Sequence, residues 1–133
     1  MSKYFLLLFF AIFCLCSSSN AQNQAKFSGI KPGMKDEKLE KMAVKLANKR
    51  GMVFDWHEVY YKAVIISDKW ELDLDRDGFL KGRKIHMELL SILPSGRCAM
   101  TDFTFKQKLL HDEKFSSALY YDRVSDLVYV DCE

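Results

Sequence analysis

The order of two hydrophobic repeats along the chain most constrains its fold, because one helical pattern comes first and only strand patterns follow it. Residues 35–50 carry the helical pattern, with the 3.6-residue period of an amphipathic helix. Its apolar positions are Leu39, Met42, Ala43, Leu46 and Ala47. Gly51 follows Lys49 and Arg50, which is typical of a helix C-terminus. We therefore expect a helix over residues 35–50 that ends at Gly51.

Strand patterns, in which apolar and polar residues alternate, dominate the rest of the chain. They lie at residues 70–75, 85–89, 99–105 and 128–132, and turn residues stand at 77–78, 93–97 and 123–126. Residues 52–66 fit either a helix or a strand, although 60–66 favour a strand. We predict a single α+β domain over residues 35–133, in which the N-terminal helix packs on a curved antiparallel sheet of four to six strands.

This outline resembles the cystatin-like and related cone-shaped α+β folds. The resemblance is one of outline and implies the fold alone. Cystatins enter a protease cleft with a hairpin of sequence Gln-x-Val-x-Gly. That motif is absent from the chain, and residues 106–110 (KQKLL) do not match it. Protease inhibition is therefore not implied.

The first twenty-one residues have the composition of an export signal. Lys3 supplies a positive start, and residues 4–16 are thirteen consecutive apolar or aromatic residues. Ser19 and Ala21 place small side chains where signal peptidase requires them. We expect residues 1–21 to be cleaved, so that the chain is secreted or periplasmic.

Two alternatives to cleavage remain for this leader. An uncleaved membrane anchor needs about twenty apolar residues, more than the leader contains. A lipoprotein attached at Cys16 is the other, but residues 13–15 are bulkier than a lipobox usually allows. With the signal removed, we expect a flexible lead-in at residues 22–34 and no stable membrane insertion.

Cleavage would leave two of the four cysteines, Cys98 and Cys132. Two cysteines in an exported chain most often form a disulfide, and closing a loop of about 35 residues contributes roughly 3–4 kcal/mol to stability. The alternative is a nucleophilic Cys98, but neither His nor Asn lies nearby in the sequence to activate it. We predict the disulfide.

Charge excludes one class of partner. Without the leader the chain has 19 Lys and Arg residues against 18 Asp and Glu residues. A nucleic-acid-binding domain needs an excess of basic residues to neutralise phosphates. We therefore expect no nucleic-acid partner.

Residues 73–78 spell D-x-D-x-D-G, the first half of a calcium loop of the EF-hand type. Asp73, Asp75 and Asp77 stand at positions 1, 3 and 5, but Lys84 stands at position 12, where a bidentate Glu is required. A β-hairpin is the simpler interpretation, with Asp73, Asp75 and Glu71 on its solvent face. A weak calcium site at the three aspartates is the alternative, and no other cofactor is expected.

The remaining polar side chains define no site by themselves. His57, His86 and His111 lack the spacing of metal ligands. The predicted helix also carries a basic stripe, which suits anionic lipid or glycan but is more typical of a solvated helix face. The stripe consists of Lys38, Lys41, Lys45 and Lys49.

We expect an exported, non-enzymatic domain that binds a protein or a small apolar ligand, as inhibitor and immunity-type proteins do. Aromatic residues make up 14% of the chain, enough to fill a core and leave some for an interface. One alternative is a calcium-stabilised secreted domain that uses the 73–78 loop. Another is a small hydrolase or isomerase in a cone-shaped fold, with a pocket His or Asp as general base.

Overall fold

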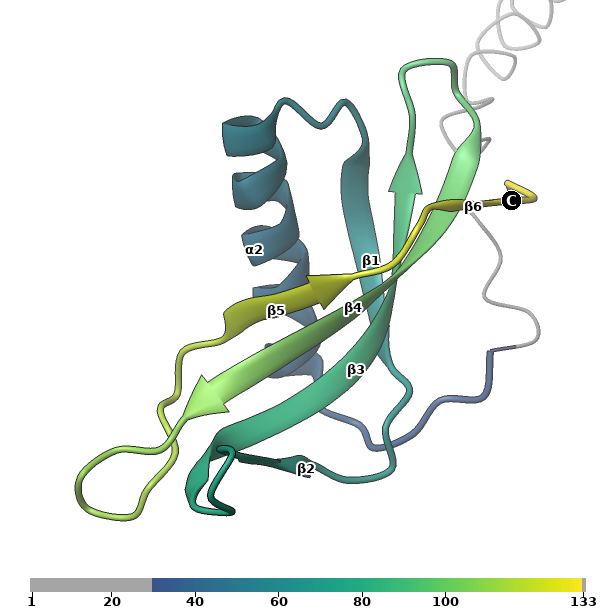
Figure 1. Cartoon of the computed structure of the whole chain (residues 1–133). Coiled ribbons are helices and arrows are strands. Elements are labelled where there is room, and N and C mark those ends of the chain that lie inside the picture. The colour runs from purple at the N-terminus through teal and green to yellow at the C-terminus, as the bar shows by residue number, and fades with distance from the viewer. Residues whose placement is uncertain (1–29, 133) are drawn as a thin grey trace, which may run out of the picture.

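The computed structural model describes residues 30–132, which form one helix and six strands (Figure 1). In chain order these are α2 (Glu37–Phe54), β1 (Val59–Ile65), β2 (Glu71–Leu74), β3 (Leu80–Ile92), β4 (Cys98–Lys108), β5 (Tyr120–Val124) and β6 (Val128–Val130). The predicted class, an N-terminal helix packed on an antiparallel sheet, is confirmed. The predicted signal peptide and residues 22–29 of the lead-in lie outside the described residues.

Two long strands form the centre of the sheet. β3 and β4 pair over eleven residue pairs, from Gly82 with Lys108 to Ile92 with Cys98. The outer edge of β3 pairs with β2 near its start and with β1 near its end. The outer edge of β4 pairs in the same way with β6 and β5. All six strands therefore belong to one antiparallel sheet.

The helix covers one end of this sheet and leaves the other uncovered. α2 packs against β1, whereas the β2–β3 hairpin extends away from the helix (Figure 1). Buried side chains from both layers form the main core. They are Leu39, Ala43, Ala47, Tyr60, Ala63, Ile65, Ile85, Met87, Leu89, Phe103, Phe105 and Leu119. Leu39, Ala43 and Ala47 confirm the apolar helix face expected from the sequence.

Polar side chains fix the position of the helix on the sheet. Asp36 caps the helix by accepting a hydrogen bond from the Leu39 N–H at 3.0 Å. Asn48 joins the helix to β1, because its side chain both donates to the Tyr60 carbonyl at 2.8 Å and accepts from the Tyr60 N–H at 2.9 Å. The helix thereby satisfies both backbone groups of Tyr60 at the edge of β1.

The expected end of the helix at Gly51 is wrong, because the helix continues for three more residues. Gly51 is buried within α2, and Asp55 adopts the left-handed conformation that ends it, with φ 56°. The Trp56 N–H then donates to the Gly51 carbonyl at 2.8 Å. The ambiguous segment 52–66 thus divides into the last turn of the helix and strand β1.

The predicted disulfide is present between Cys98 and Cys132, whose Cα atoms lie 5.4 Å apart. Cys98 begins β4, and Cys132 follows β6, the strand that pairs with this end of β4. Leu90, Ile92, Met100 and Val130 surround the bridge in a second, smaller apolar cluster. Within residues 30–132 there is no helix with the length and apolar composition that a membrane span requires.

The position of Gly51 inside the helix leads to a test. A Cβ atom there would meet Trp56 at 3.5 Å, an ordinary van der Waals contact. Gly51→Ala should therefore raise the free energy of unfolding by roughly 0.5–1 kcal/mol, since alanine favours a helix interior. Urea denaturation would measure the change, and Asp55→Ala is the matched control, which should destabilise because Asp55 has a positive φ. A loss of stability in Gly51→Ala would contradict this helix boundary.

Candidate functional site

The β2–β3 hairpin buries one of the three carboxylates that the sequence predicts on its solvent face. Asp73 was expected on the solvent face, but the structure buries it to 7% exposure. Glu71 and Asp75 are exposed, as the sequence predicts, and Leu72 and Leu74 are exposed as well, to 66% and 50%. Burial in β2 therefore does not alternate, and Asp73 is the one buried residue of this strand.

Lysine ammonium groups make the burial of Asp73 favourable. Its carboxylate lies 3.3 Å from Lys84 Nζ and 3.9 Å from Lys81 Nζ. Lys84 also lies 3.8 Å from Asp122, which in turn pairs with Lys106 at 3.1 Å. These ion pairs connect β2, β3, β4 and β5 on one face of the sheet.

Opposing effects act on the Asp122 carboxyl within this network. Burial alone would raise its pKa. The hydrogen bond and charge of Lys106, together with the charges of Lys84 and Arg123, outweigh burial and lower the pKa of Asp122 below its usual value. Asp122 therefore stays ionised and keeps the network intact at neutral pH.

The acidic turn is built by Asp75. Its carboxylate accepts hydrogen bonds from the N–H groups of Asp77 and Phe79, both at 2.9 Å. Gly78 takes the positive φ of 85° that this turn requires. The D-x-D-G sequence of residues 75–78 therefore forms a tight turn in this structure.

The three candidate calcium ligands are not brought together. Asp73 contacts lysines, whereas the Asp75 carboxylate is occupied by the backbone of the turn. No three His, Cys, Asp or Glu side chains are grouped to hold a metal ion within the described part of the chain, residues 30–132. Calcium binding by Asp73, Asp75 and Asp77 stays a prediction.

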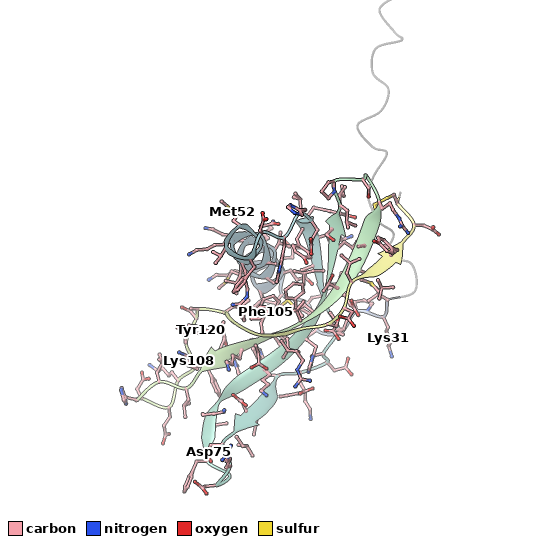
Figure 2. The ribbon with its side chains drawn as sticks, turned by 45° about the horizontal axis from the view of Figure 1, so that its top comes forward. Lys31, Met52, Asp75, Phe105, Lys108 and Tyr120 are labelled. Carbon is pink, nitrogen blue, oxygen red and sulfur yellow. A yellow bond between two sulfur atoms is a disulfide. The ribbon has the colours of Figure 1, made fainter. Side chains whose placement is uncertain are left out.

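Four large apolar side chains project from the same hairpin, and we call them the hairpin patch. Leu72, Leu74, Phe79 and Leu80 are 66%, 50%, 70% and 37% exposed. Leu74 and Leu80 face each other across the two strands. The hairpin tip, marked by Asp75, lies at the far end of the molecule from Met52 of the helix (Figure 2). Sequence reasoning missed this patch because an alternating pattern does not show whether another layer will cover the apolar residues of a strand.

An aromatic clamp holds the base of the hairpin. The Arg83 guanidinium lies 4.1 Å from the Trp70 ring centre and 4.5 Å from that of Phe115. Its Nε and Nη2 atoms both donate to Gln107 Oε1, at 2.9 and 2.8 Å. Burial lowers the pKa of Arg83. The clamp joins β3 to β4, to Trp70 before β2 and to the segment before β5.

The histidines do not gather into one site. His57 and His111 are exposed in separate segments. His86 lies on the sheet, with Nε2 3.4 Å from Glu71 and Nδ1 3.0 Å from Thr104 Oγ1. The Ser67 hydroxyl accepts a hydrogen bond from the His86 backbone N–H at 2.9 Å. These contacts link His86 to the start of β2 and to β4.

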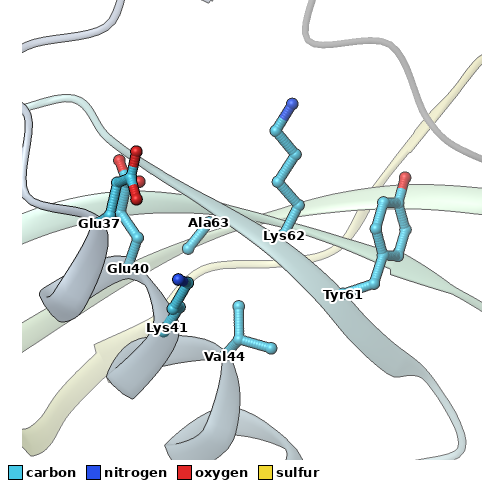
Figure 3. A pocket seen from close by; sticks show the side chains of 7 residues that line it. All are labelled: Glu37, Glu40, Lys41, Val44, Tyr61, Lys62 and Ala63. Atoms are coloured by element: carbon cyan, nitrogen blue, oxygen red, sulfur yellow. The ribbon is translucent and has the colours of Figure 1, made fainter.

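A cleft of about 390 Å³ lies between α2 and the edge of β1 (Figure 3). It is lined by Glu37, Glu40, Lys41, Val44, Tyr61, Lys62 and Ala63. Glu40 has a structural contact here, because its Oε1 accepts a hydrogen bond from the Ile65 N–H at 3.3 Å. The lining mixes both signs of charge, so this cleft defines no ligand class.

Comparison with known proteins gives no family for the chain: no protein-family model, curated protein or solved structure matches it.

The buried ion pair on the hairpin can be tested by removing one charge. Asp73→Asn should lower the free energy of unfolding by roughly 1–3 kcal/mol, because Lys84 loses a charged hydrogen-bond acceptor. Urea denaturation would measure the loss. Asp68→Asn, an exposed position in the preceding loop, is the matched control and should change stability by less than about 0.5 kcal/mol. Equal stability of both variants would show that the ion pair contributes nothing.

A carboxylate pair on β3 and β4 gives a pH-dependent test. Glu88 faces Asp102 across the strands, and burial together with the Asp102 charge raises the pKa of Glu88. A raised pKa in the folded state means that stability falls as pH rises through it. Glu88→Gln should therefore melt at a higher temperature than the parent protein at pH 7, and the difference should vanish below about pH 4, where both forms are neutral.

Melting curves of the two proteins between pH 3 and pH 8 would measure this effect. Asp102→Asn should act in the same direction, since it removes the neighbouring charge. A difference between Glu88→Gln and the parent that does not change with pH would contradict the electrostatic origin.

Proposed function

We propose that the chain is an exported, non-enzymatic binding domain that docks the hairpin patch onto a partner protein. The exposure of four large apolar residues on a hairpin whose other face is held by ion pairs carries this proposal. Exposed apolar residues scattered singly are ordinary on protein surfaces. Four of them on one hairpin, with Leu74 and Leu80 paired across its strands, are typical of an interaction site.

The energetics favour a partner that covers the hairpin patch. Burying a Leu or Phe side chain contributes about 1.5–3 kcal/mol relative to leaving it in water. The Asp75 turn, the lysine pairs of Asp73 and the Arg83 clamp hold the hairpin in one conformation. Little conformational entropy would then be lost on binding, and a larger part of the burial energy would appear as affinity.

The shape of the hairpin favours a protein over a small apolar ligand. A small molecule needs a concave pocket that surrounds most of its surface. The hairpin instead extends away from the helix-covered end of the sheet (Figures 1 and 2). A projecting hairpin with apolar side chains suits insertion into a groove of a larger protein, which is how an inhibitor or immunity-type domain would act.

The place of action follows from the leader and the cysteines. Residues 1–21 have the composition of a signal peptide, and the Cys98–Cys132 disulfide suits an oxidising compartment. We therefore place the partner in the periplasm or outside the cell.

This function can be tested with the full chain, exported and purified in its oxidised form. It would be immobilised and exposed to the extracytoplasmic fraction of its own host, and captured proteins would be identified by mass spectrometry. The double variant Leu74→Asp, Phe79→Asp should lose a captured partner at least tenfold, because two charges replace apolar contacts. Val53→Asp, an equally exposed apolar position at the end of α2, is the matched control and should retain it.

Binding of the purified partner to the three proteins would then be measured by calorimetry, after melting curves show that each is folded. A partner that binds the double variant and the parent equally would contradict docking through the hairpin patch. So would the absence of any partner that distinguishes Leu74→Asp, Phe79→Asp from Val53→Asp.

A further inference from the structure

A second surface, separate from the hairpin patch, lies where α2 meets the segment that leads into β5. Here a groove of about 290 Å³ separates the helix from the chain before Tyr120. It is lined by Met42, Lys45, Leu46, Lys49, Ala118 and Leu119. We call it the helix groove.

The floor of the helix groove is apolar and recessed. Leu119 is 8% exposed, and Met42 and Leu46 are half-buried against the main core. Because Leu119 is buried and Met42 and Leu46 are only partly exposed, a flat membrane would contact little of this floor unless the helix inserted. A single extended acyl chain, by contrast, is narrow enough to lie along such a floor.

The rim of the helix groove is cationic. Lys45 and Lys49 stand one helical turn apart, and neither forms an ion pair with any residue of the described chain, 30–132. A shallower hollow, of about 540 Å³, continues along the helix and shares Met42 and Lys45 with the groove. Lys38 and Lys41 line it, with Glu37 as the one acidic lining residue. The basic stripe of the sequence therefore lines both the helix groove and this hollow, which share Met42 and Lys45.

We propose that the helix groove binds a single-chain anionic amphiphile, such as a fatty acid. The acyl chain would lie on the floor formed by Met42, Leu46 and Leu119. The carboxylate would be held by the ammonium groups of Lys45 and Lys49, whose charge it complements. This site would not depend on the hairpin patch and adds a ligand to the proposed protein partner.

The test uses the full chain, exported and oxidised, with laurate as the probe at concentrations below those at which it forms micelles. Titration calorimetry should show one saturable site. Decanoate should bind roughly tenfold more weakly, since two methylenes fewer leave water. The cationic amphiphile dodecyltrimethylammonium should not bind at the same concentrations, because the rim is positive.

Two variants locate the site. Lys45→Gln, Lys49→Gln should weaken laurate binding at least tenfold, and Lys69→Gln, an exposed lysine of the β1–β2 loop, is the matched control and should not. Ala118→Trp places a large side chain in the groove from an exposed position, so it should block laurate without disturbing the core. Leu74→Asp, Phe79→Asp should bind laurate normally, so the failure of one proposal is distinguishable from that of the other.

Several outcomes would overturn this assignment. Laurate binding that is unsaturable, or that survives Ala118→Trp, would indicate adsorption to the surface. Equal binding of laurate and dodecyltrimethylammonium would exclude a role for the lysines. Co-sedimentation with vesicles containing anionic phosphatidylglycerol, without binding of monomeric laurate, would identify the stripe as a membrane contact instead.

Discussion

The pairing of β3 with β4 is the interaction on which the rest of the structure depends. Its eleven residue pairs carry the buried side chains of one sheet face and provide the edges to which the four short strands bind. The aromatic stack of Phe103 and Phe105, with ring centres 5.5 Å apart, lies on β4 at the middle of this pairing. Within residues 30–132 none of the short strands pairs with another, so each is held in the sheet by β3 or β4.

The length of this central pair explains both what the sequence could predict and what it could not. The 18 residues of α2 span about 27 Å, whereas the 13 residues of β3 span about 43 Å. Beneath the helix the apolar pattern translated directly into a core, as at Ala43 and Ala47. Beyond the helix, no other element of residues 30–132 covers the sheet, so the apolar residues of β2 are exposed although their pattern resembles that of a covered strand. Asp73 is buried there because it pairs with Lys84. The pattern of a single strand carries no information about that cross-strand partner.

The disulfide could be predicted from the sequence, whereas the end of the helix could not. Pairing of Cys98 with Cys132 followed from the count of cysteines and the expected compartment, without any geometry. Gly51 was misread because glycine after basic residues is typical of helix ends. Its burial beside Trp56, which is tertiary packing, lets the helix continue to Asp55. The candidate sites were harder to predict: the basic stripe was visible in the sequence, but the apolar floor beside it includes Leu119, which lies at least seventy positions further along the chain.

The uncovered end of the sheet also explains how a hairpin with an apolar face can remain in place. At the end of β3 and β4 near Cys98, a covalent bond fixes the strands, together with a small apolar cluster. At the other end, no disulfide joins the strands of residues 30–132. The strands are held there by the ion pairs of Asp73 and Asp122 and by the Arg83 clamp. These polar contacts occupy one face and the base of the hairpin, so stability there does not require Leu72, Leu74 and Phe79 to be buried. Within residues 30–132 the side chains of the hairpin patch remain exposed, and this exposure is the observation that supports the proposed docking onto a partner protein.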